Sequence, residues 1–514
     1  MKPEKMMDVI GQIDDALVEE FAQRRPPRFR VPWSLVATAA CLCLVIASLV
    51  FLRSAGLLPV APMPTDPTQT TTQPSETTMP TETTQPMENI VSTDWIIEED
   101  TSITGEVIFA IPLRGQQGMN AMIAAFNEIY PNIKIMLHSY DNNGASAINA
   151  ALLTGEVDVM TSVGLRATYK RCDNGLFYDL TKLVDQEKID LAAQWGTDAY
   201  TYDGKIYTFP CGGVSNYIAI NMNAWNEAGL GELPTEWTWD EYLDASRKMT
   251  KKDNTGKTVV YGGSDHHSLH SFLYAHCQVE GGDIYYDKDG TPAYDNPTVL
   301  AQLERKLKAE LTDGIWYPLA QYRSESMQCQ MLFCKGIVAT TVISNITRFL
   351  HNTEVFPDVN WITGFAPYPT MEEGQVNYMS GVMPDIHAGI NAYIEEEKLP
   401  AAWAFLKWFS TYGSKYLTVA GYQSTWRGTD NGELLPLIYG SGEEAAKWVD
   451  VESFERVVGR VDLPFAAETT ITSYSDVSGA LTDPMMKAIN GETSAQECLR
   501  QALEEAEQAI KDNK

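Results

Sequence analysis

The sequence predicts an α/β protein of two compact lobes, preceded by a single transmembrane helix and a disordered linker. Three observations predict it: an uncharged apolar run at residues 31–52, a Thr- and Pro-rich stretch at 59–86, and alternating strand and helix patterns from Glu106 onward. Alternation of this kind is typical of parallel sheets covered by helices. At 514 residues the chain exceeds the length at which one core keeps growing, so we expect two compact units.

Residues 1–30 form a charged head with six Lys/Arg and six Asp/Glu. Apolar residues recur at helical spacing over residues 6–23 with acids on the opposite side, which predicts a short amphipathic helix. This helix either docks a cytoplasmic partner or lies at the membrane surface without a partner.

The apolar run predicts a membrane-spanning helix over residues 31–53. Its 22 uncharged residues would span about 33 Å as a helix, enough for a bilayer core of about 30 Å. Four arginines precede the run and only Arg53 follows it. The positive-inside bias therefore predicts a single-pass cell-membrane protein with a cytoplasmic N-terminus and everything after Arg53 outside.

Two other interpretations of this run are weaker. A cleaved signal peptide would have a shorter charged head and a small-residue cleavage site, which the run lacks. Lipid attachment at Cys41 would leave the apolar residues 42–52 exposed. We therefore expect the membrane to be contacted through this helix.

The next segment, residues 54–103, is predicted to be an extended extracellular linker. Residues 59–86 contain seven Pro and ten Thr and almost nothing that could be buried. Such a composition stays solvated and serves as a spacer.

The globular domain is predicted over residues 104–514. A buried strand at 107–111, a helix at 119–129 ended by Pro131, a strand at 133–137, a helix at 145–153 and a strand at 157–160 follow one another. This βαβαβ order opens a parallel, doubly wound lobe.

Three local motifs further along have a physical basis of their own. Thr238 to Glu241 reads as a capping box that begins a helix. Tyr202 to Lys205 reads as a tight Asp-Gly turn between short strands. Near the C-terminus, an apolar stripe at helical spacing predicts a terminal helix; its members are Leu499, Leu503, Ala506 and Ile510.

Charge and cysteine content exclude several classes of protein. The formal net charge is −30, so a nucleic-acid partner, which requires a basic surface, is disfavoured. Of eight cysteines, two lie in the apolar run and six are scattered through the exported part without any CxxC pair. These six are buried thiols or form one or two bridges, and no zinc signature is present.

Taken in order, the segments of the globular domain resemble the bacterial extracellular solute-binding proteins, in particular the sugar-binding class that serves ABC transporters, whose familiar form is maltose-binding-protein-like. The resemblance covers the chain from about Gly105 onward. Its pieces include AAFNEIYPNIKI, LLTGEVDVM, YDGKIYTFP, LPTEWTWDEYLDASRKMT, VEGGDIYYDKDGTPAYDNP, ITGFAPYP and HAGINAYIEEEKLPAAWAFLKWF.

The resemblance implies a two-lobed periplasmic-binding-protein-like fold of type II, with interleaved lobes that close around a ligand by hinge bending. Crossings between the lobes are expected near 210–217 and after 339–344. The implied function is capture of a carbohydrate, an oligosaccharide first of all, or another polar solute, for uptake through the permease subunits of an ABC transporter. We expect a monomer that needs no cofactor.

Sugar ligands need aromatic faces and planar polar groups, which the resemblance places on loops at strand ends. The expected ligand-binding residues are Arg114, Gln116, Gln117, Tyr140, Ser162, Arg166, Tyr217, His267, His270, Ser344, Asn345, Gly381, Trp426 and Tyr474. Ser162 stands where maltose-binding-protein-like relatives stack a Trp, so the ligand need not resemble maltose.

Four of the seven histidines lie within residues 266–276. His266 and His270 would share one face of a helix as a zinc pair, but no third ligand stands in register. We therefore expect no metal, and favour His267 and His270 as hydrogen-bond donors to the ligand.

Catalytic motifs are missing from the sequence. It has no GxSxG, no P-loop and no Rossmann GxGxxG in context, so we do not expect an enzyme. Two alternatives to an uptake receptor remain open: a ligand sensor that signals through residues 1–30, and an extracellular carbohydrate-active enzyme on the same scaffold.

Overall fold

The computed structural model describes residues 102–112, 116–140, 145–196, 201–266, 268–466 and 474–512. The predicted cytoplasmic head, the helix at 31–53 and nearly all of the linker lie outside this part of the chain. Among the described residues, no helix combines the length and the apolar character needed to cross a bilayer.

The predicted opening of the domain is confirmed. The structure forms β1 (Gly105–Pro112), α4 (Met119–Ile129), β2 (Ile133–Tyr140), α5 (Ala145–Leu153) and β3 (Val159–Val163). β1 pairs in parallel with both β2 and β3. The last four residues of β1 and the first four of β3 are buried, as expected for strands covered on both faces.

β1, β2 and β3 belong to a six-stranded sheet with the order β13-β6-β12-β3-β1-β2. Its further strands are β6 (Thr208–Val214), β12 (Met383–Ile390) and β13 (Gln423–Ser424). β12 runs antiparallel to both β3 and β6, so β6 has the direction of β1, β2 and β3. This sheet defines the first lobe.

A three-stranded antiparallel sheet with the order β10-β7-β11 defines the second lobe. Its strands are β7 (Tyr217–Asn221), β10 (Thr340–Ile343) and β11 (Thr363–Pro367). Tyr217 pairs with both Ile343 and Pro367, which are the last residues of their strands. Only residues 215–216 separate β6 from β7, so the C-terminal edge of the first sheet adjoins the edge of the second where Tyr217 lies.

Within the described residues, the chain passes between the sheets three times. The first passage lies at 214–217, between β6 and β7. The second runs from the end of β11 to the start of β12, because β11 joins the second sheet before the chain returns. The third follows β13, since residues from Leu434 onward join the core of the second lobe.

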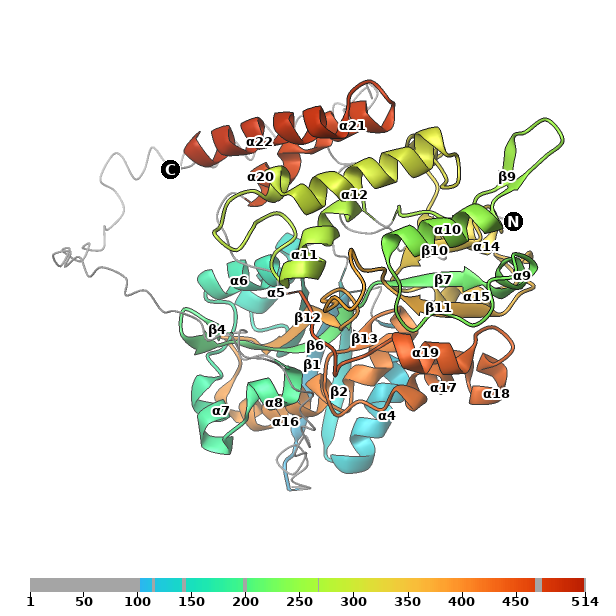
Figure 1. The fold of residues 1–514 in the computed structure, drawn as a ribbon. Helices are drawn as coiled ribbons and strands as arrows, with labels where there is room; N and C mark the ends of the chain where they lie inside the picture. Colours follow the sequence, from blue (N-terminus) through green and yellow to red (C-terminus); the bar gives the residue numbers. More distant parts are fainter. Residues whose placement is uncertain are drawn as a thin grey trace, which may run out of the picture. The chain divides into compact units, whose positions relative to one another are not determined.

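Each lobe has its own core. Phe109 and Phe126 of the first lobe pack edge-on against Phe405, and Phe109 also packs edge-on against Phe409. These last two belong to α16 (Leu399–Ser410). In the second lobe, α12 (Pro297–Leu307) and α22 (Ala495–Asp512), far apart in sequence, lie side by side (Figure 1).

The remaining α-helices are α6 (Leu165–Asp173), α7 (Thr181–Glu187), α8 (Leu191–Trp195), α9 (Met222–Glu227), α10 (Trp239–Met249), α11 (Tyr274–Glu280), α13 (Leu319–Ser324), α14 (Cys329–Cys334), α15 (Thr347–Leu350), α17 (Leu434–Tyr439), α18 (Gly442–Ala445), α19 (Val451–Val457), α20 (Tyr474–Ala480) and α21 (Thr482–Ile489). The short strands are β4 (Thr201–Tyr202), β5 (Lys205–Ile206), β8 (Lys251–Lys252) and β9 (Thr258–Val260). Short 3₁₀ segments are η3 (Ser271–Leu273), η4 (Ala293–Asp295), η6 (Glu396–Lys398), η7 (Ser414–Ala420) and η8 (Asn431–Glu433), and η5 (Lys308–Thr312) is a π-helical turn.

The local motifs form as the sequence predicts. Thr238 and Glu241 make the reciprocal bonds of a capping box at the start of α10. Asp203 and Gly204 adopt positive φ angles of 51° and 70° in the β4–β5 hairpin, the geometry of a type I′ turn. On α22, Leu499 is buried while Leu503 and Ile510 pack against the same core. The six cysteines from Cys172 onward are all buried, and the structure holds them as thiols and not as disulfide bridges.

Candidate functional site

The carboxyl ends of four strands meet along one edge of the first sheet. β1 and β2 end in register, Pro112 opposite Tyr140, and β3 ends at Val163. β6 ends at Val214, which pairs with Met383 at the start of β12. We call the loops that follow these ends, together with the adjoining ends of β10 and β11, the strand-end site.

The side chains of the first lobe at this edge are tied together by hydrogen bonds. Ser162 is fully buried, and its hydroxyl accepts from Arg171 Nη1 at 2.7 Å and from Thr168 Oγ1 at 2.9 Å. The Tyr140 hydroxyl donates to the Thr161 carbonyl at 2.6 Å. Arg171 lies on α6, and burial lowers its pKa below the ordinary value. Sequence reasoning did not single it out.

Three of the expected ligand-binding residues come together from both lobes. Arg166, at the start of α6, lies 3.1 Å from the Asp283 carboxylate of the second lobe. Its guanidinium lies over the ring of Tyr474, the first residue of α20. Tyr285 packs edge-on against Tyr474, and its hydroxyl is 2.8 Å from Nδ1 of His270. We call these five residues the Arg166 cluster.

The electrostatics of the Arg166 cluster follow from burial. Burial lowers the pKa of His270 to about 4, so its imidazole is neutral at physiological pH. Burial also raises the pKa of Tyr285 well above its usual value. Nε2 of His270 is buried and has no hydrogen-bond partner in the described part of the chain. The cluster thus combines an aromatic face, a cation, a carboxylate and an unused imidazole nitrogen.

Asp283 and Tyr285 were missed because they lie in a segment, residues 280–292, that reads as a polar turn. A local signal was present, because Tyr285 and Tyr286 stand next to Asp287, and aromatic faces are what a sugar ligand needs. Nothing in the sequence, however, indicates that Asp283 pairs with a residue 117 positions away.

Other expected residues lie inside the lobes. Tyr217 is 1% exposed, and its ring packs edge-on against Phe365 while its hydroxyl accepts from the Ile346 amide at 3.3 Å. The carbonyl of Ser344 accepts from Gln423 Nε2 at 3.2 Å. This last hydrogen bond joins the residue after β10 to β13 of the first sheet.

Asn345 and Trp426 are also held by protein partners. Asn345 Oδ1 accepts from Gln330 Nε2 at 3.0 Å. The indole nitrogen of Trp426, a residue only 3% exposed, donates to Gln194 Oε1 at 2.9 Å within the first-lobe core. Gln116 is half-buried and Gln117 is exposed at the start of α4, while Arg114 and His267 lie outside the described residues.

Gly381 marks a close approach of two segments. A Cβ at this position would lie 2.3 Å from the Pro464 carbonyl oxygen and 2.6 Å from that of Leu463. The neighbouring Ser380 lines a cavity of about 640 Å³ in the second lobe, whose other walls include Trp237, Tyr368 and Arg456. The cavity lies beside the strand-end site and does not include the Arg166 cluster.

The histidine segment is not the helix considered from sequence. His270 precedes the 3₁₀ turn η3 and His266 lies in a loop, so the two do not share a helix face. His266 Nε2 binds the Tyr317 carbonyl at 2.5 Å. Among the described residues, the group with metal-ligating geometry is His276, Glu280 and Asp287.

The architecture matches that of known proteins. Residues 112–416, more than half of the chain, match the family model of the bacterial extracellular solute-binding proteins. A sugar transporter protein of Rhizobium etli in an open conformation superimposes with a TM-score of 0.62 at 17% identity, covering 79% of this chain and 99% of that one.

Two further solved structures have comparable scores. An ABC substrate-binding protein of Listeria monocytogenes in complex with cycloalternan has a TM-score of 0.57 at 16% identity, covering 80% of this chain and 100% of that one. A maltose-bound protein of T. maritima has a TM-score of 0.56 at 16% identity, covering 78% and 99%. At sequence identities this low, the structural similarity shows a shared fold and nothing about the ligand.

Proposed function

Because the chain belongs to the bacterial extracellular solute-binding protein family, we propose that it captures a carbohydrate outside the cell and delivers it to an ABC transporter. An oligosaccharide is the expected ligand. Binding shifts the equilibrium between open and closed lobes and makes or breaks no covalent bond.

The Arg166 cluster is the observation that carries this proposal. A sugar presents hydroxyls to planar polar groups and C–H faces to aromatic rings. The cluster contains both kinds of group: the guanidinium of Arg166 and Nε2 of His270 are polar, and the ring of Tyr474 is aromatic. Because Arg166 comes from the first lobe and Tyr474 from the second, a ligand here would contact both.

The ligands of similar solved structures support a sugar as the ligand and also indicate which other ligands are possible. Two of them hold cycloalternan and maltose. Another, from Mycobacterium tuberculosis, holds glycerophosphocholine with a TM-score of 0.55 at 16% identity, covering 80% of this chain and 100% of that one, so the same fold also takes a polar ligand that is not a sugar.

The decisive test is titration of the purified protein with a panel of oligosaccharides and polar non-sugars. Intrinsic tryptophan fluorescence and calorimetry measure the binding. We expect saturable binding of at least one oligosaccharide and no release of reducing ends in a parallel assay. Binding restricted to non-sugar solutes would overturn the carbohydrate assignment. Turnover of the glycan would instead favour the carbohydrate-active enzyme.

We also propose that residues 31–53 anchor the domain at the cell membrane. The support is the 22-residue uncharged run with arginines crowded before it. In intact cells, an added protease should release the domain from the outside and leave residues 1–30 protected. Release of the intact protein by salt washing would contradict the anchor.

A sensor remains the second candidate because of the charged head. Deletion of residues 2–23 should leave ligand uptake unchanged if the protein is a transport receptor. Loss of ligand-dependent gene expression in the same strain, with uptake intact, would favour the sensor.

A further inference from the structure

Three side chains at the end of α11 stand close enough to hold one metal ion. His276 and Glu280 lie four residues apart on α11, so the helix brings them to one face. Asp287 approaches from the turn that follows. The three offer ligand atoms that all lie within 4.8 Å of one another.

The two imidazole nitrogens of His276 have different surroundings. Nε2 lies 2.8 Å from the Ile284 carbonyl oxygen, and because a carbonyl only accepts, Nε2 carries a proton. Nδ1 is buried, in a residue 1% exposed, and has no hydrogen-bond partner in the described part of the chain. A histidine that donates through one nitrogen to a carbonyl and leaves the other free has the orientation of a metal ligand.

The distance between Nδ1 and Asp287 points the same way. Nδ1 lies 3.6 Å from Asp287 Oδ1, which is too long for a hydrogen bond. Ligands bound to one tetrahedral ion at about 2.0–2.2 Å stand about 3.4 Å apart. If neither a cation nor an added proton lies between them, the lone pair of Nδ1 faces the negatively charged Asp287 carboxylate, and the two repel each other.

The surroundings also fit a cation. Asn296 Nδ2 donates to Asp287 Oδ1 at 2.9 Å and orients that carboxylate. The neighbouring thiol of Cys277 donates to the Asp283 carbonyl at 3.1 Å, so it is engaged elsewhere. One imidazole and two carboxylates form a mixed nitrogen and oxygen set, which suits Zn²⁺ better than Ca²⁺ or Mg²⁺.

We propose that His276, Glu280 and Asp287 form a binding site for a divalent transition-metal cation of the Zn²⁺ type. The site ties the two ends of the turn between Glu280 and Asp287 together. That turn carries Asp283, the partner of Arg166 in the first lobe. A bound cation therefore holds Asp283 in place for the contact between the lobes, whatever solute the protein captures.

The test uses full-length protein that has been stripped with a chelator and titrated calorimetrically with Zn²⁺, with Mn²⁺ and Ca²⁺ as comparators. We expect one Zn²⁺ per chain, a higher thermal unfolding midpoint, and slower amide hydrogen exchange in residues 281–287. Glu280→Gln and Asp287→Asn should each weaken Zn²⁺ binding by at least about tenfold. Both changes nearly preserve the shape of the side chain. If one variant fails to fold, the other variant alone tests the site.

The matched control is Glu304→Gln, an exposed acid on α12, which should bind Zn²⁺ as the unaltered protein does. Two results would overturn the proposal. One is the absence of saturable Zn²⁺ binding to the stripped protein. The other is stoichiometric binding that persists in both site variants, which would place the ion elsewhere.

Discussion

At the residue scale, the Arg166 cluster shows how single side chains take on several contacts. The guanidinium of Arg166 pairs with Asp283 on one side and covers the ring of Tyr474. A planar guanidinium can stack on an aromatic ring and at the same time form a forked hydrogen bond to a carboxylate, which a lysine ammonium cannot do. The choice of arginine at this position therefore has a physical consequence that can be measured.

Replacement of Arg166 by lysine should lower affinity for the captured solute about tenfold. The substitution keeps the charge and loses the stacking, which is worth about 1–2 kcal/mol when the pair is partly buried. Calorimetric titration of Arg166→Lys against the unaltered protein measures the change. Arg247→Lys, on the exposed face of α10, is the control and should bind normally. Equal affinities for all three proteins would remove Arg166 from the ligand site.

The buried imidazole of His387 predicts a loss of stability in acid. Burial lowers the pKa of His387 from 6.5 to about 4. The unfolded chain therefore takes up a proton between these pH values while the folded protein does not. The contribution of His387 to stability is thus fully present above about pH 6.5 and is lost as the pH drops toward 4. From pH 7.5 to 5.5 the loss from this residue is about 1 kcal/mol.

Urea unfolding of the unaltered protein and of His387→Gln at both pH values tests this expectation. The variant should lose less stability on acidification, whatever its stability at pH 7.5. Identical pH slopes for the two proteins would show that His387 is not neutral in the fold.

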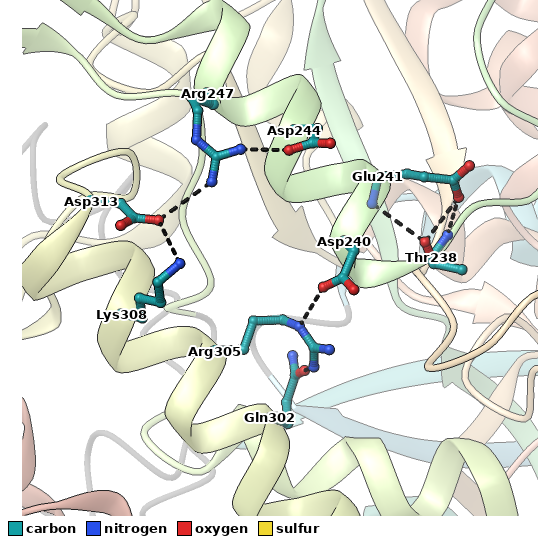
Figure 2. A network of polar contacts seen from close by, with 9 residues as sticks. All are labelled: Thr238, Asp240, Glu241, Asp244, Arg247, Gln302, Arg305, Lys308 and Asp313. Carbon is teal, nitrogen blue, oxygen red and sulfur yellow. Dashed lines mark hydrogen bonds and ion pairs between the residues drawn. The ribbon is translucent and has the colours of Figure 1, made fainter.

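At the element scale, α10 illustrates how local chemistry sets a boundary. Figure 2 shows the capping box of Thr238 and Glu241 beside surface ion pairs that join α10 to the segment containing Arg305 and Asp313. The Glu241 carboxylate accepts from the Thr238 amide at 2.7 Å. Each ion pair has an exposed partner, Asp240 or Arg247, and therefore contributes little, whereas the cap satisfies amides that have no partner within the helix.

The free energy of unfolding should therefore respond differently to two substitutions on α10. Thr238→Ala removes the cap and should destabilise the protein by about 1 kcal/mol. Asp240→Asn breaks the ion pair with Arg305. Because the Asp240 side chain is 83% exposed, this change should alter the free energy of unfolding by less than about 0.5 kcal/mol. Chemical denaturation of both variants makes the comparison. A larger effect from Asp240→Asn would reverse this ranking of the contacts.

At the scale of the whole molecule, the described parts of the two lobes are linked by chain passages and by side-chain contacts. Besides the Arg166–Asp283 pair, Arg348 Nη1 of the second lobe donates to the Ala420 carbonyl of the first at 2.8 Å. In the proposed function, contacts of this kind bias the equilibrium between open and closed lobes, and a ligand shifts that equilibrium only through its different affinity for the two states.

Asp283→Asn should shift that equilibrium toward the open state. The asparagine oxygen can still accept from the Tyr285 amide, which the aspartate does at 2.9 Å, but the charge that attracts Arg166 is lost. We expect a larger radius of gyration in small-angle scattering and about tenfold weaker solute binding. Unchanged scattering together with unchanged affinity would show that the pair does not influence closure.

The sequence by itself determined the local structure. The βαβαβ opening, the capping box at Thr238, the Asp-Gly hairpin and the terminal helix all depend on periodicity and on residues within a few positions of one another. The order of these segments was also enough to predict the family and the two-lobed fold. Arg166, His270 and Tyr474 were expected to bind ligand because of the resemblance to that family, and their role in binding stays a prediction.

Only the tertiary structure decided which of those residues meet. Arg166 and Asp283 pair across 117 positions, and Trp426 bonds to Gln194 across 232. It also showed that His276, rather than His266 or His270, stands with two carboxylates. The physical reason is that such contacts depend on how strands are ordered in two sheets and on how side chains pack between elements, and no local pattern in the chain encodes that packing.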